Sequence, residues 1–454
     1  MISFSAKRQI YEALPEWTKL SVGMIPFAWL AGGHYRAHLA AGRALERASE
    51  EELRQFSSSR LSKLLDYATM HVSAYRKHRS AFERFTPTEA LKDFPFLDKE
   101  IIMADQSAYV SDEAKALPHY RATTGGSTGR QMEIVMDNHS QSVELAFMHR
   151  QWERVGYTPR HRKATFRGTT INAERGVYWK LNPIYNELQF SVFHMTEANM
   201  PAYFERMRRW RPMFIHGYPS AVDMLAEAIL RSDIPLPSIR AVLLGSEGTT
   251  TQQRERIEAA FKARVYTWYG HTERVVMAGE CEYSSEYHAF PDYGLFEMLG
   301  RDGETLTEDG AYGEIVGTGF VNRLMPLIRY RTDDMARLRK VPCVCGRCWP
   351  RFSEVEGRWT AEYMTGRSGA RITLTAVNMH GDIFANVIRF QYVHNEPGAA
   401  TIRVQPAPGF GPADEAGILA AHHAKVGDEM RFSIECTDEI PLTSRGKLRR
   451  LVKE

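Results

Sequence analysis

Residues 123–130 carry the strongest chemical signal in the sequence, a run with three glycines and four hydroxyl side chains. Glycine costs entropy inside a helix or strand, and Ser and Thr compete there for backbone hydrogen bonds, so the run predicts a loop. Exposed amides and hydroxyls on one loop are typical of a phosphate-binding site. The alternative is a flexible linker, but the alternating residues 131–136 predict a strand directly after it. We therefore predict a phosphate loop that includes Thr124, Gly126, Ser127, Thr128 and Gly129.

Three further stretches carry side chains suited to binding a nucleotide. Residues 269–273 read Tyr-Gly-His-Thr-Glu and offer a ring, a hydroxyl and a carboxylate, which suit a flat base, a phosphate and a metal ion. Residues 329–334 end in two adjacent acids, which could accept hydrogen bonds from ribose hydroxyls, cap a helix or bind the neighbouring arginines. Lys447 follows Gly446 near the C-terminus. A lysine in a glycine turn is usually a solvated side chain, so the motif alone is not specific.

The cysteines form a separate cluster. Three of the five lie within residues 343–348, on both sides of Gly346, and Cys281 and His288 lie upstream. Closely spaced cysteines around a glycine turn are typical of a tetrahedral zinc site. The alternative is a set of unligated cysteines in a reducing compartment. The pattern is not that of a secreted disulfide framework, so we expect a cytoplasmic protein.

The middle of the chain repeats one arrangement that would position these motifs. Residues 213–215, 241–244 and 264–268 predict short strands, one helix is predicted through Leu230 with Ser220 as its cap, and another is predicted from about Thr250 to Phe261. Strand, loop and helix in this order predict a parallel sheet covered by helices. Ligands on such sheets lie beyond the carboxyl ends of the strands. We therefore expect the loops after residues 215, 244 and 268 to converge on one site.

The two ends of the chain have a different character. Residues 1–100 predict helices, with a capping box that begins at Ser49. The apolar stretch 22–31 is too short to span a bilayer and is expected in the core. From about residue 290 short strands alternate with glycine turns, and residues 360–454 predict the order strand, strand, helix, strand. We predict an α/β fold with a large N-terminal domain, residues 1–357, which holds parallel sheets, helices and a small β-barrel-like part, and a small α+β domain, residues 358–454.

Composition narrows the class of partner. The 454 residues include 58 basic and 55 acidic side chains, which give a net charge of +3. A balance this close to neutral implies no general attraction to nucleic acid. The hydrophobic content of 43% is that of an ordinary globular protein. We therefore expect small-molecule partners.

Together and in this order, the four nucleotide-type motifs resemble those of the acyl-adenylate-forming superfamily of acyl-coenzyme A synthetases, adenylation domains and luciferases. The resemblance covers nearly the whole chain. It is closest to the phenylacetate–coenzyme A ligase branch, and within that branch to proteins associated with capsular polysaccharide gene clusters. The closer similarity rests on His-Gly-Tyr-Pro-Ser at 216–220, Met-Pro-Leu-Ile-Arg-Tyr-Arg at 325–331 and Cys-Val-Cys-Gly-Arg at 343–347.

The resemblance implies a role for each motif. Lys447 would lie on a mobile C-terminal lid and bridge the carboxylate and the phosphate, Thr272 would contact the α-phosphate, and Glu273 would bind Mg²⁺. Tyr269 would lie against adenine, and Asp334 would bind the ribose with support from Arg358. The remaining implied ATP-binding residues are Gly245, Ser246, Glu247, Gly270 and His271. The implied zinc ligands are Cys281, His288, Cys343 and Cys345, with Cys348 as a substitute.

The implied activity is ATP-dependent activation of a carboxylic acid as its acyl-adenylate, with transfer of the acyl group to coenzyme A or another thiol. An amide ligase with an amine acceptor is one alternative, and a non-catalytic nucleotide-binding scaffold is another. Asp333 replaces a usual glycine, and Thr360 and Ala361 replace two acids that usually form the domain hinge. The altered hinge favours the scaffold, whereas Glu273 and Lys447 favour an enzyme.

Overall fold

The computed structural model describes residues 11, 14, 16–124, 132–169, 171, 176–232, 234–356, 362–377, 379, 382–441 and 449–453. The chain divides into two compact units. Unit 1 is Met1–Ala122, Glu133–Thr158 and Thr267–Arg358; unit 2 is Thr123–Met132, Pro159–Tyr266 and Trp359–Glu454. The second unit combines the predicted lid with part of the predicted N-terminal domain. The division into domains 1–357 and 358–454 stays a prediction.

Helices form the N-terminal part of unit 1. Ser49 caps the longest of them through the predicted box, since its side chain accepts from the Glu52 amide while the Glu52 carboxylate accepts from the Ser49 amide. The helices are α2 (Glu16–Gly23), α3 (Phe27–Leu45), α4 (Glu50–His71), α5 (Arg79–Arg84), α6 (Pro87–Leu91), α7 (Lys99–Ala104) and α8 (Ser140–Glu153), with 3-10 turns η1 (Ser73–His78), η2 (Gln106–Tyr109) and η3 (Asp112–Lys115).

The apolar stretch 22–31 is not the buried segment that the sequence analysis expected. Met24, Ile25 and Trp29 are 85%, 45% and 73% exposed, and only Phe27 and Ala31 are buried. The chain turns at residues 24–26 between α2 and α3, so Met24 and Ile25 lie on the bend, and at the start of α3 Phe27 and Ala31 are buried while Trp29 is exposed. Among the helices that the structure describes, none is long and apolar enough to cross a membrane.

Antiparallel strands form the rest of unit 1, and those after residue 290 are the ones that the short strands and glycine turns predicted. They lie in the order β11-β12-β13-β14-β10-β9-β8, and neighbouring strands are antiparallel. The strands are β8 (Val265–Gly270), β9 (Met277–Glu280), β10 (Tyr287–Ala289), β11 (Gly294–Leu299), β12 (Tyr312–Gly319), β13 (Tyr330–Arg339) and β14 (Arg351–Glu356). Strands β1 (His119–Thr123) and β2 (Glu133–Asp137) form a separate pair that flanks the predicted phosphate loop.

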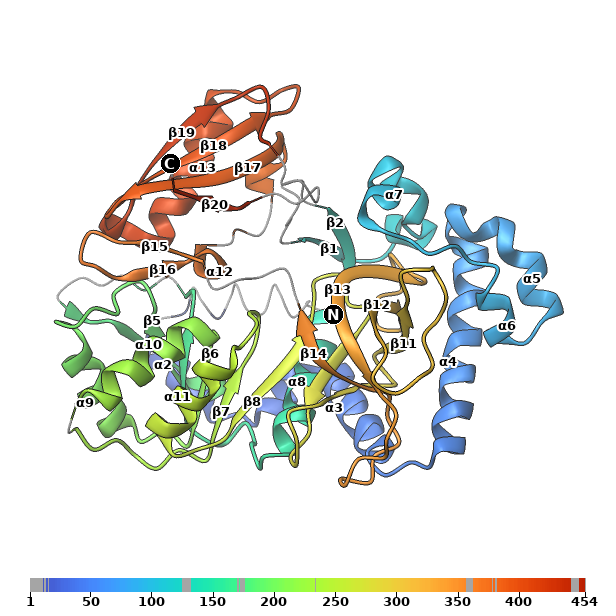
Figure 1. Ribbon diagram of the computed structural model, residues 1–454, viewed down its shortest axis with the longest axis horizontal. Helices are drawn as coiled ribbons and strands as arrows, with labels where there is room; N and C mark the ends of the chain where they lie inside the picture. The colour runs from blue at the N-terminus through green and yellow to red at the C-terminus, as the bar shows by residue number, and fades with distance from the viewer. Residues whose placement is uncertain are drawn as a thin grey trace. The chain divides into compact units, whose positions relative to one another are not determined.

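Unit 2 contains the predicted parallel sheet. Its strands lie in the order β7-β6-β3-β5-β4, where only β4 is antiparallel to its neighbour. Helices lie against these strands (Figure 1). The elements are β3 (Lys163–Arg167), β4 (Trp179–Asn182), the 3-10 turn η5 (Pro183–Tyr185), β5 (Glu187–Ser191), α9 (Met200–Trp210), β6 (Phe214–Gly217), α10 (Pro219–Leu230), β7 (Ala241–Leu244) and α11 (Thr251–Phe261).

The C-terminal part of unit 2 has the predicted order of strand, strand, helix and strand. Its four-stranded sheet runs β19-β18-β17-β20, and β17 and β18 form an antiparallel hairpin. The elements are β15 (Tyr363–Thr365), β16 (Arg371–Thr373), α12 (Leu374–Val377), η6 (Asp382–Phe384), β17 (Val387–Glu396), β18 (Ala399–Pro406), α13 (Pro412–Val426), η7 (Gly427–Glu429), β19 (Arg431–Cys436) and β20 (Leu451–Val452). The mixed α/β fold class is therefore confirmed.

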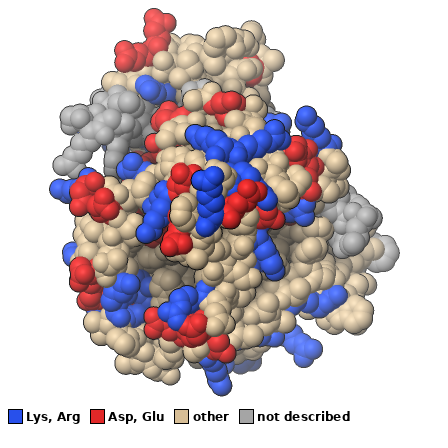
Figure 2. Space-filling view, turned by 90° about the vertical axis from the view of Figure 1, so that its right-hand side faces the viewer, with Lys and Arg blue, Asp and Glu red and all other residues tan. Residues whose placement is uncertain are grey.

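Surface charges agree with the balanced composition. On the face shown in Figure 2, basic and acidic side chains are interspersed and do not separate into fields of one sign. Mixed charges of this kind give little long-range attraction for a polyanion.

Candidate active site

Tyr269 and Asp334 bring two of the predicted motifs together in unit 1. Tyr269 lies near the end of β8 and Asp334 lies on β13, and the Tyr269 hydroxyl donates to Asp334 Oδ2 over 2.9 Å. Burial raises the pKa of Tyr269 well above its ordinary value, and the Asp334 charge raises it further. The hydroxyl therefore stays protonated and fixes the carboxylate that is predicted to bind ribose.

Glu273 is held from two sides in the same unit. Its Oε1 accepts from the Tyr330 hydroxyl at 3.2 Å, and its Oε2 lies 3.1 Å from His271 Nδ1. The Glu273 side chain is only 12% exposed. The His271 Nε2 atom is buried, and no hydrogen-bond partner for it exists among the described residues. Thr272 is half-buried in the same loop, and Gly270 ends β8.

This arrangement fits the predicted Mg²⁺ ligand. Mg²⁺ in nucleotide sites is commonly bound by one or two carboxylates together with substrate phosphates and water. Glu273 supplies one nearly buried carboxylate whose orientation is fixed by neighbouring hydrogen bonds. The loop that carries it joins two antiparallel strands, since Gly270 of β8 pairs with Met277 of β9. From the sequence, this loop was expected only to follow a parallel strand, and its return into an antiparallel strand was not predicted.

Asp333 occupies the place of the usual glycine with a backbone that favours glycine. Its φ is +57°, and the ladder between β12 and β13 shifts register in this region. Its amide donates to Glu314 Oε1 over 2.9 Å, and Arg331 binds the same Glu314 carboxylate. Aspartate is one of the few residues that adopt this left-handed conformation at small cost. The substitution therefore preserves the bend that places Asp334.

We expect Asp333→Val to destabilise the protein and Asp333→Gly to leave it nearly unchanged. A β-branched residue at this φ should lower the free energy of unfolding by about 1–2 kcal/mol, whereas glycine should change it by about 1 kcal/mol or less. Denaturant unfolding of both variants measures the difference. Equal stability of the valine variant and the wild type would show that the bend does not require this backbone conformation.

The Gly245–Glu247 stretch follows β7 in unit 2. Ser246 has a φ of +71°, and its Oγ accepts from Arg167 over 2.6 Å. Glu247 Oε2 accepts from the Ser220 amide at the start of α10 over 3.0 Å. Because these residues and the Tyr269 loop belong to different units, their convergence on one site stays a prediction.

Several predicted residues lie outside the described part of the chain. They are Gly126, Ser127, Thr128, Gly129, Arg358 and Lys447, so their roles stay predictions. Thr124 is described and buried at the base of the predicted phosphate loop. Its amide donates to the Met132 carbonyl over 2.9 Å, and the Met132 amide donates to Thr124 Oγ1 over 3.1 Å. This pair closes the base of the loop.

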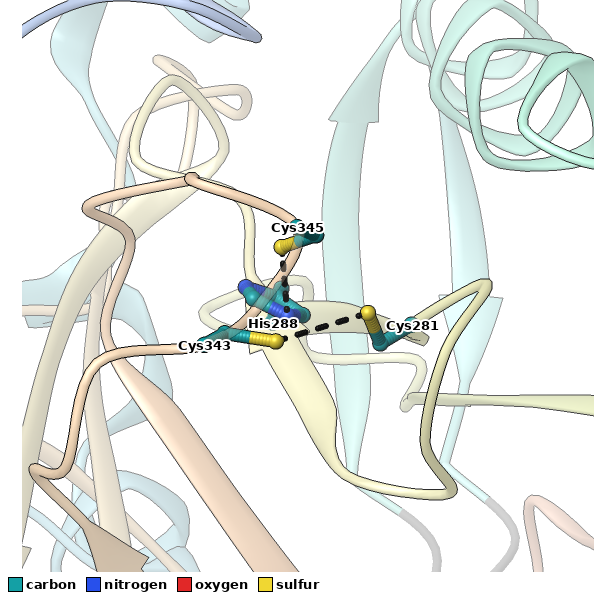
Figure 3. Close-up of side chains that lie close together, drawn as sticks. All are labelled: Cys281, His288, Cys343 and Cys345. Carbon is teal, nitrogen blue, oxygen red and sulfur yellow. Dashed lines mark hydrogen bonds between the residues drawn. The ribbon is translucent and has the colours of Figure 1, made fainter.

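The four predicted zinc ligands lie together in unit 1 (Figure 3). Cys281 follows β9, His288 lies on β10, and Cys343 and Cys345 lie between β13 and β14. All four ligand atoms lie within 4.8 Å of one another, with 3.6 Å from Cys281 Sγ to Cys343 Sγ and from Cys345 Sγ to His288 Nε2. Tetrahedral zinc with bonds of about 2.0–2.3 Å separates its ligand atoms by about 3.5–3.8 Å. Two of the ligand pairs therefore have the separation of a tetrahedral zinc site, and the limit of 4.8 Å for the others lies about 1 Å above it, so the group fits zinc with a small adjustment of side chains.

The electrostatics of the cluster also fit a metal. Burial and the neighbouring Arg154, Arg347 and Arg351 lower the pKa of His288 to about 3, so its imidazole is neutral and can act as a ligand. Burial raises the pKa of the Cys281 thiol to about 12, so metal binding would have to displace a proton. One feature departs from common zinc sites, because the buried His288 Nδ1 has no hydrogen-bond partner in the described structure. Cys348 is exposed and outside the group, so it is not needed as a substitute ligand.

The cysteine loop also fastens the N-terminal helices to the strands of unit 1. Arg347 binds Glu282 through two hydrogen bonds of 2.7 and 2.9 Å and also pairs with Glu46, the residue that follows α3. The Trp349 indole donates to the Leu45 carbonyl over 3.0 Å. A metal in this loop would therefore stabilise the structure at the end of β9 opposite the Glu273 loop.

We expect about one tightly bound zinc per chain, because the described residues contain one four-ligand set. Cys345→Ser should lower the melting temperature by roughly 5 °C or more while it changes the Michaelis constant for ATP little, since the metal is structural. Metal analysis and thermal unfolding of tag-free protein are the measurements. Cys436→Ser, an exposed cysteine outside the group, is the matched control. Metal-free protein with five freely titratable thiols would contradict the assignment.

Two contacts of the site were not identified from the sequence. Tyr330 lies in the motif at 325–331, from which no role was predicted for it, although its hydroxyl donates a hydrogen bond to Glu273. Arg167 was not singled out, although it binds Ser246. The only sequence signal for Arg167 is an arginine directly after a buried strand, at the end where parallel-sheet ligands bind.

Comparisons with known proteins agree with this fold. No family model matches the chain. The chain is 22% identical to protein CapK of Staphylococcus aureus over 412 residues, which cover 88% of each chain. It is 25% identical to a phenylacetate–coenzyme A ligase of Thermus thermophilus over 69% of this chain and 72% of that one. A phenylacetate–coenzyme A ligase of Escherichia coli is 24% identical over 65% of this chain and 69% of that one.

A solved structure shares the fold over most of the chain. A 2-hydroxyisobutyryl-CoA ligase bound to 2-HIB-AMP and CoA in its thioesterification state has a TM-score of 0.57 and 18% identity. The match covers 90% of this chain and 91% of that one. At this identity the likeness concerns the fold.

Proposed function

We propose that this chain, a homologue of CapK and of phenylacetate–coenzyme A ligases with the acyl-CoA ligase fold of the acyl-adenylate-forming superfamily, activates a carboxylic acid with ATP. The acid oxygen attacks the α-phosphorus of ATP, the bond to the β-phosphate oxygen breaks, and pyrophosphate leaves. A carboxylate is a poor electrophile, and adenylation gives its carbonyl carbon a good leaving group, AMP. The acyl group then passes to a thiol, for which coenzyme A is the first candidate.

The observation that carries the proposal is the meeting of the two nucleotide motifs in unit 1. Asp334, oriented by Tyr269, would accept hydrogen bonds from the ribose. Glu273, oriented by Tyr330, would hold Mg²⁺, which would offset the charge on the departing pyrophosphate. Thr272 directly precedes Glu273 in the same loop and would contact the α-phosphate. Gly270 and His271 would complete the nucleotide side of the loop.

The remaining predicted site residues, some of which lie outside the described part of the chain, complete the proposal. Ser127, Thr128 and Gly129 would hold the ATP phosphates, with Thr124 at the base of their loop. Lys447 would stabilise the charge that develops when the carboxylate and the phosphate, both anions, approach each other. Arg358 would support the ribose-binding acid. Gly245, Ser246 and Glu247 would line the adenine and acyl side.

The similarity to CapK spans more of the chain than the similarity to the phenylacetate–coenzyme A ligases, 88% against 69%. This similarity is a weak pointer to capsular polysaccharide biosynthesis, and an adenylate-forming amide ligase with an amine acceptor in polysaccharide or natural-product biosynthesis stays the second candidate. A non-catalytic scaffold would keep the nucleotide site but would not need Lys447. A cytoplasmic location and small-molecule partners belong to the same proposal.

Product analysis tests the proposal. Protein is incubated with ATP, Mg²⁺, candidate acids and either coenzyme A or an amino sugar, and products are identified by mass spectrometry. We expect AMP and pyrophosphate, with an acyl thioester in the coenzyme A reaction. An amide formed only with the amine would establish the second candidate, and ADP with inorganic phosphate would contradict adenylation.

A further inference from the structure

Arg167 lies at the carboxyl end of β3 in unit 2, where β3 pairs with β6 and β6 in turn pairs with β7. Its Nη2 donates to Ser246 Oγ over 2.6 Å, and its Nη1 lies 3.3 Å from His216 Nε2. Its guanidinium carbon lies 4.9 Å from the centre of the Tyr218 ring. Residues from three adjacent parallel strand ends therefore hold one cation, at the edge of the sheet where ligands bind.

The backbone at the end of β6 packs closely against β3 and so stabilises this arrangement. A Cβ at Gly217 would lie 2.7 Å from the Phe166 carbonyl oxygen, so only glycine allows this close approach. The approach lets the Tyr218 amide donate to the same oxygen over 3.0 Å, which places the ring against Arg167. Ser246 holds its hydroxyl toward Arg167 from a left-handed backbone with a φ of +71°. A strained serine is a feature typical of functional sites.

His216 holds Arg167 as a neutral acceptor. Its Nδ1 lies 3.0 Å from the Leu243 carbonyl oxygen, which can only accept, so the proton is on Nδ1. Nε2 then carries the lone pair that accepts from Arg167. The contacts of Arg167 are thus a hydroxyl, a neutral imidazole and a ring, none of which carries negative charge.

The charge of Arg167 is not balanced within the described structure. Every ion pair recorded for the described residues involves other cations, and none includes Arg167. Neighbouring polar atoms also lack partners, because Ser220 Oγ and Glu247 Oε1 are buried and make no hydrogen bond with described residues. Ser220 is 9% exposed. Buried polar atoms are nearly always satisfied, so these two atoms need a partner, such as an ordered water, that the described residues do not supply.

We propose that Arg167 is a specificity residue and that the acid activated by this protein carries a second anionic group, a carboxylate or a phosphate, which Arg167 binds. This inference rests on the proposed function, because it names the class of acid for the same reaction. A guanidinium binds planar or tetrahedral anions through two parallel hydrogen bonds. An unsubstituted phenyl or alkyl group beside Arg167 would exclude water and leave the guanidinium charge unpaired, which is costly.

The test compares matched acids in ATP–pyrophosphate exchange. Dicarboxylates from malonate to adipate are compared with their monomethyl esters, which remove the second charge, and with phosphonocarboxylates of equal chain length. We expect the favoured dianionic acid to exceed its ester by about 10- to 100-fold in kcat/KM. Arg167→Gln should abolish that preference, and Arg167→Lys should retain part of it. The ratio between the dicarboxylate and the phosphonate identifies the anionic group.

Arg162→Gln is the matched control. Arg162 directly precedes the same strand at its other end. Like Arg167, it lies against an aromatic ring, that of Trp210, and it donates a hydrogen bond to the Trp210 carbonyl. The Arg162→Gln variant should leave the rate of ATP–pyrophosphate exchange unchanged. Equal loss with charged and esterified acids in Arg167→Gln, at an unchanged melting temperature, would overturn the proposal, because Arg167 would then bind the reacting carboxylate.

Direct binding separates this proposal from the proposed function. Calorimetry measures binding of the dicarboxylates and their esters to the full chain without ATP. Binding that favours the dicarboxylate and is lost in Arg167→Gln supports the anion site. If no acid then supports exchange, that second result counts against adenylation and not against the site. Exchange that favours neutral acids and persists in Arg167→Gln would overturn the site and leave adenylation established.

Discussion

In the Lys447→Ala variant, the ATP–pyrophosphate exchange rate is expected to fall by at least about 100-fold while ATP binding stays nearly intact. A lysine that meets both anions only as they react stabilises the transition state more than the bound ATP. Its loss should therefore lower kcat far more than it changes the dissociation constant for ATP. Exchange kinetics and ATP calorimetry on the same preparation measure the two quantities.

Lys453→Ala provides the control for this substitution. Lys453 is an exposed lysine near the C-terminus, so its loss removes the same charge at a described, solvated position. It should leave exchange unchanged. Near-normal exchange in Lys447→Ala with the preferred acid would remove Lys447 from the mechanism.

Glu273→Gln is expected to reduce Mg²⁺-dependent exchange by about 100-fold or more without unfolding the protein. The amide has nearly the same shape and can still accept from Tyr330, but it lacks the charge that would hold Mg²⁺. The side chain lies in a loop between β8 and β9, so little core packing changes. Exchange as a function of Mg²⁺ concentration, together with thermal unfolding, measures both parts of the expectation.

Tyr330→Phe distinguishes the charge of Glu273 from its positioning. This variant keeps the carboxylate and removes the hydrogen bond from Tyr330 to Oε1, so we expect a decrease of about tenfold or less. A Mg²⁺ dependence that is the same in Glu273→Gln and the wild type would exclude Glu273 as a metal ligand.

The regular elements were predictable because their signals are local. The helix from Thr251 to Phe261 begins after Thr250, whose side chain accepts from the Gln253 amide as the capping pattern requires. The α10 boundary was less accurate. Ser220 was expected to cap this helix, but the helix begins at Pro219, because proline is favoured in the first helical position and its fixed φ suits the first turn.

The contacts of the candidate site were less predictable because they join distant residues. Tyr269 and Asp334 are 65 positions apart, and no local pattern pairs them. The four-residue metal group could be named because cysteine spacing and the resemblance together limit the choice. The exposure of Met24 and Trp29 was missed because hydrophobicity alone shows neither that the chain bends at Met24 nor that Trp29 lies on the exposed side of α3.

Acid-dependent ATP–pyrophosphate exchange tests the central claim most directly. Labelled pyrophosphate is incubated with the protein, ATP, Mg²⁺ and each acid, with coenzyme A omitted so that only adenylation is measured. We predict that label enters ATP only when an accepted acid is present and that Lys447→Ala loses this incorporation. Failure of every acid class to support incorporation, in protein that binds ATP, would contradict adenylation and leave a nucleotide-binding scaffold.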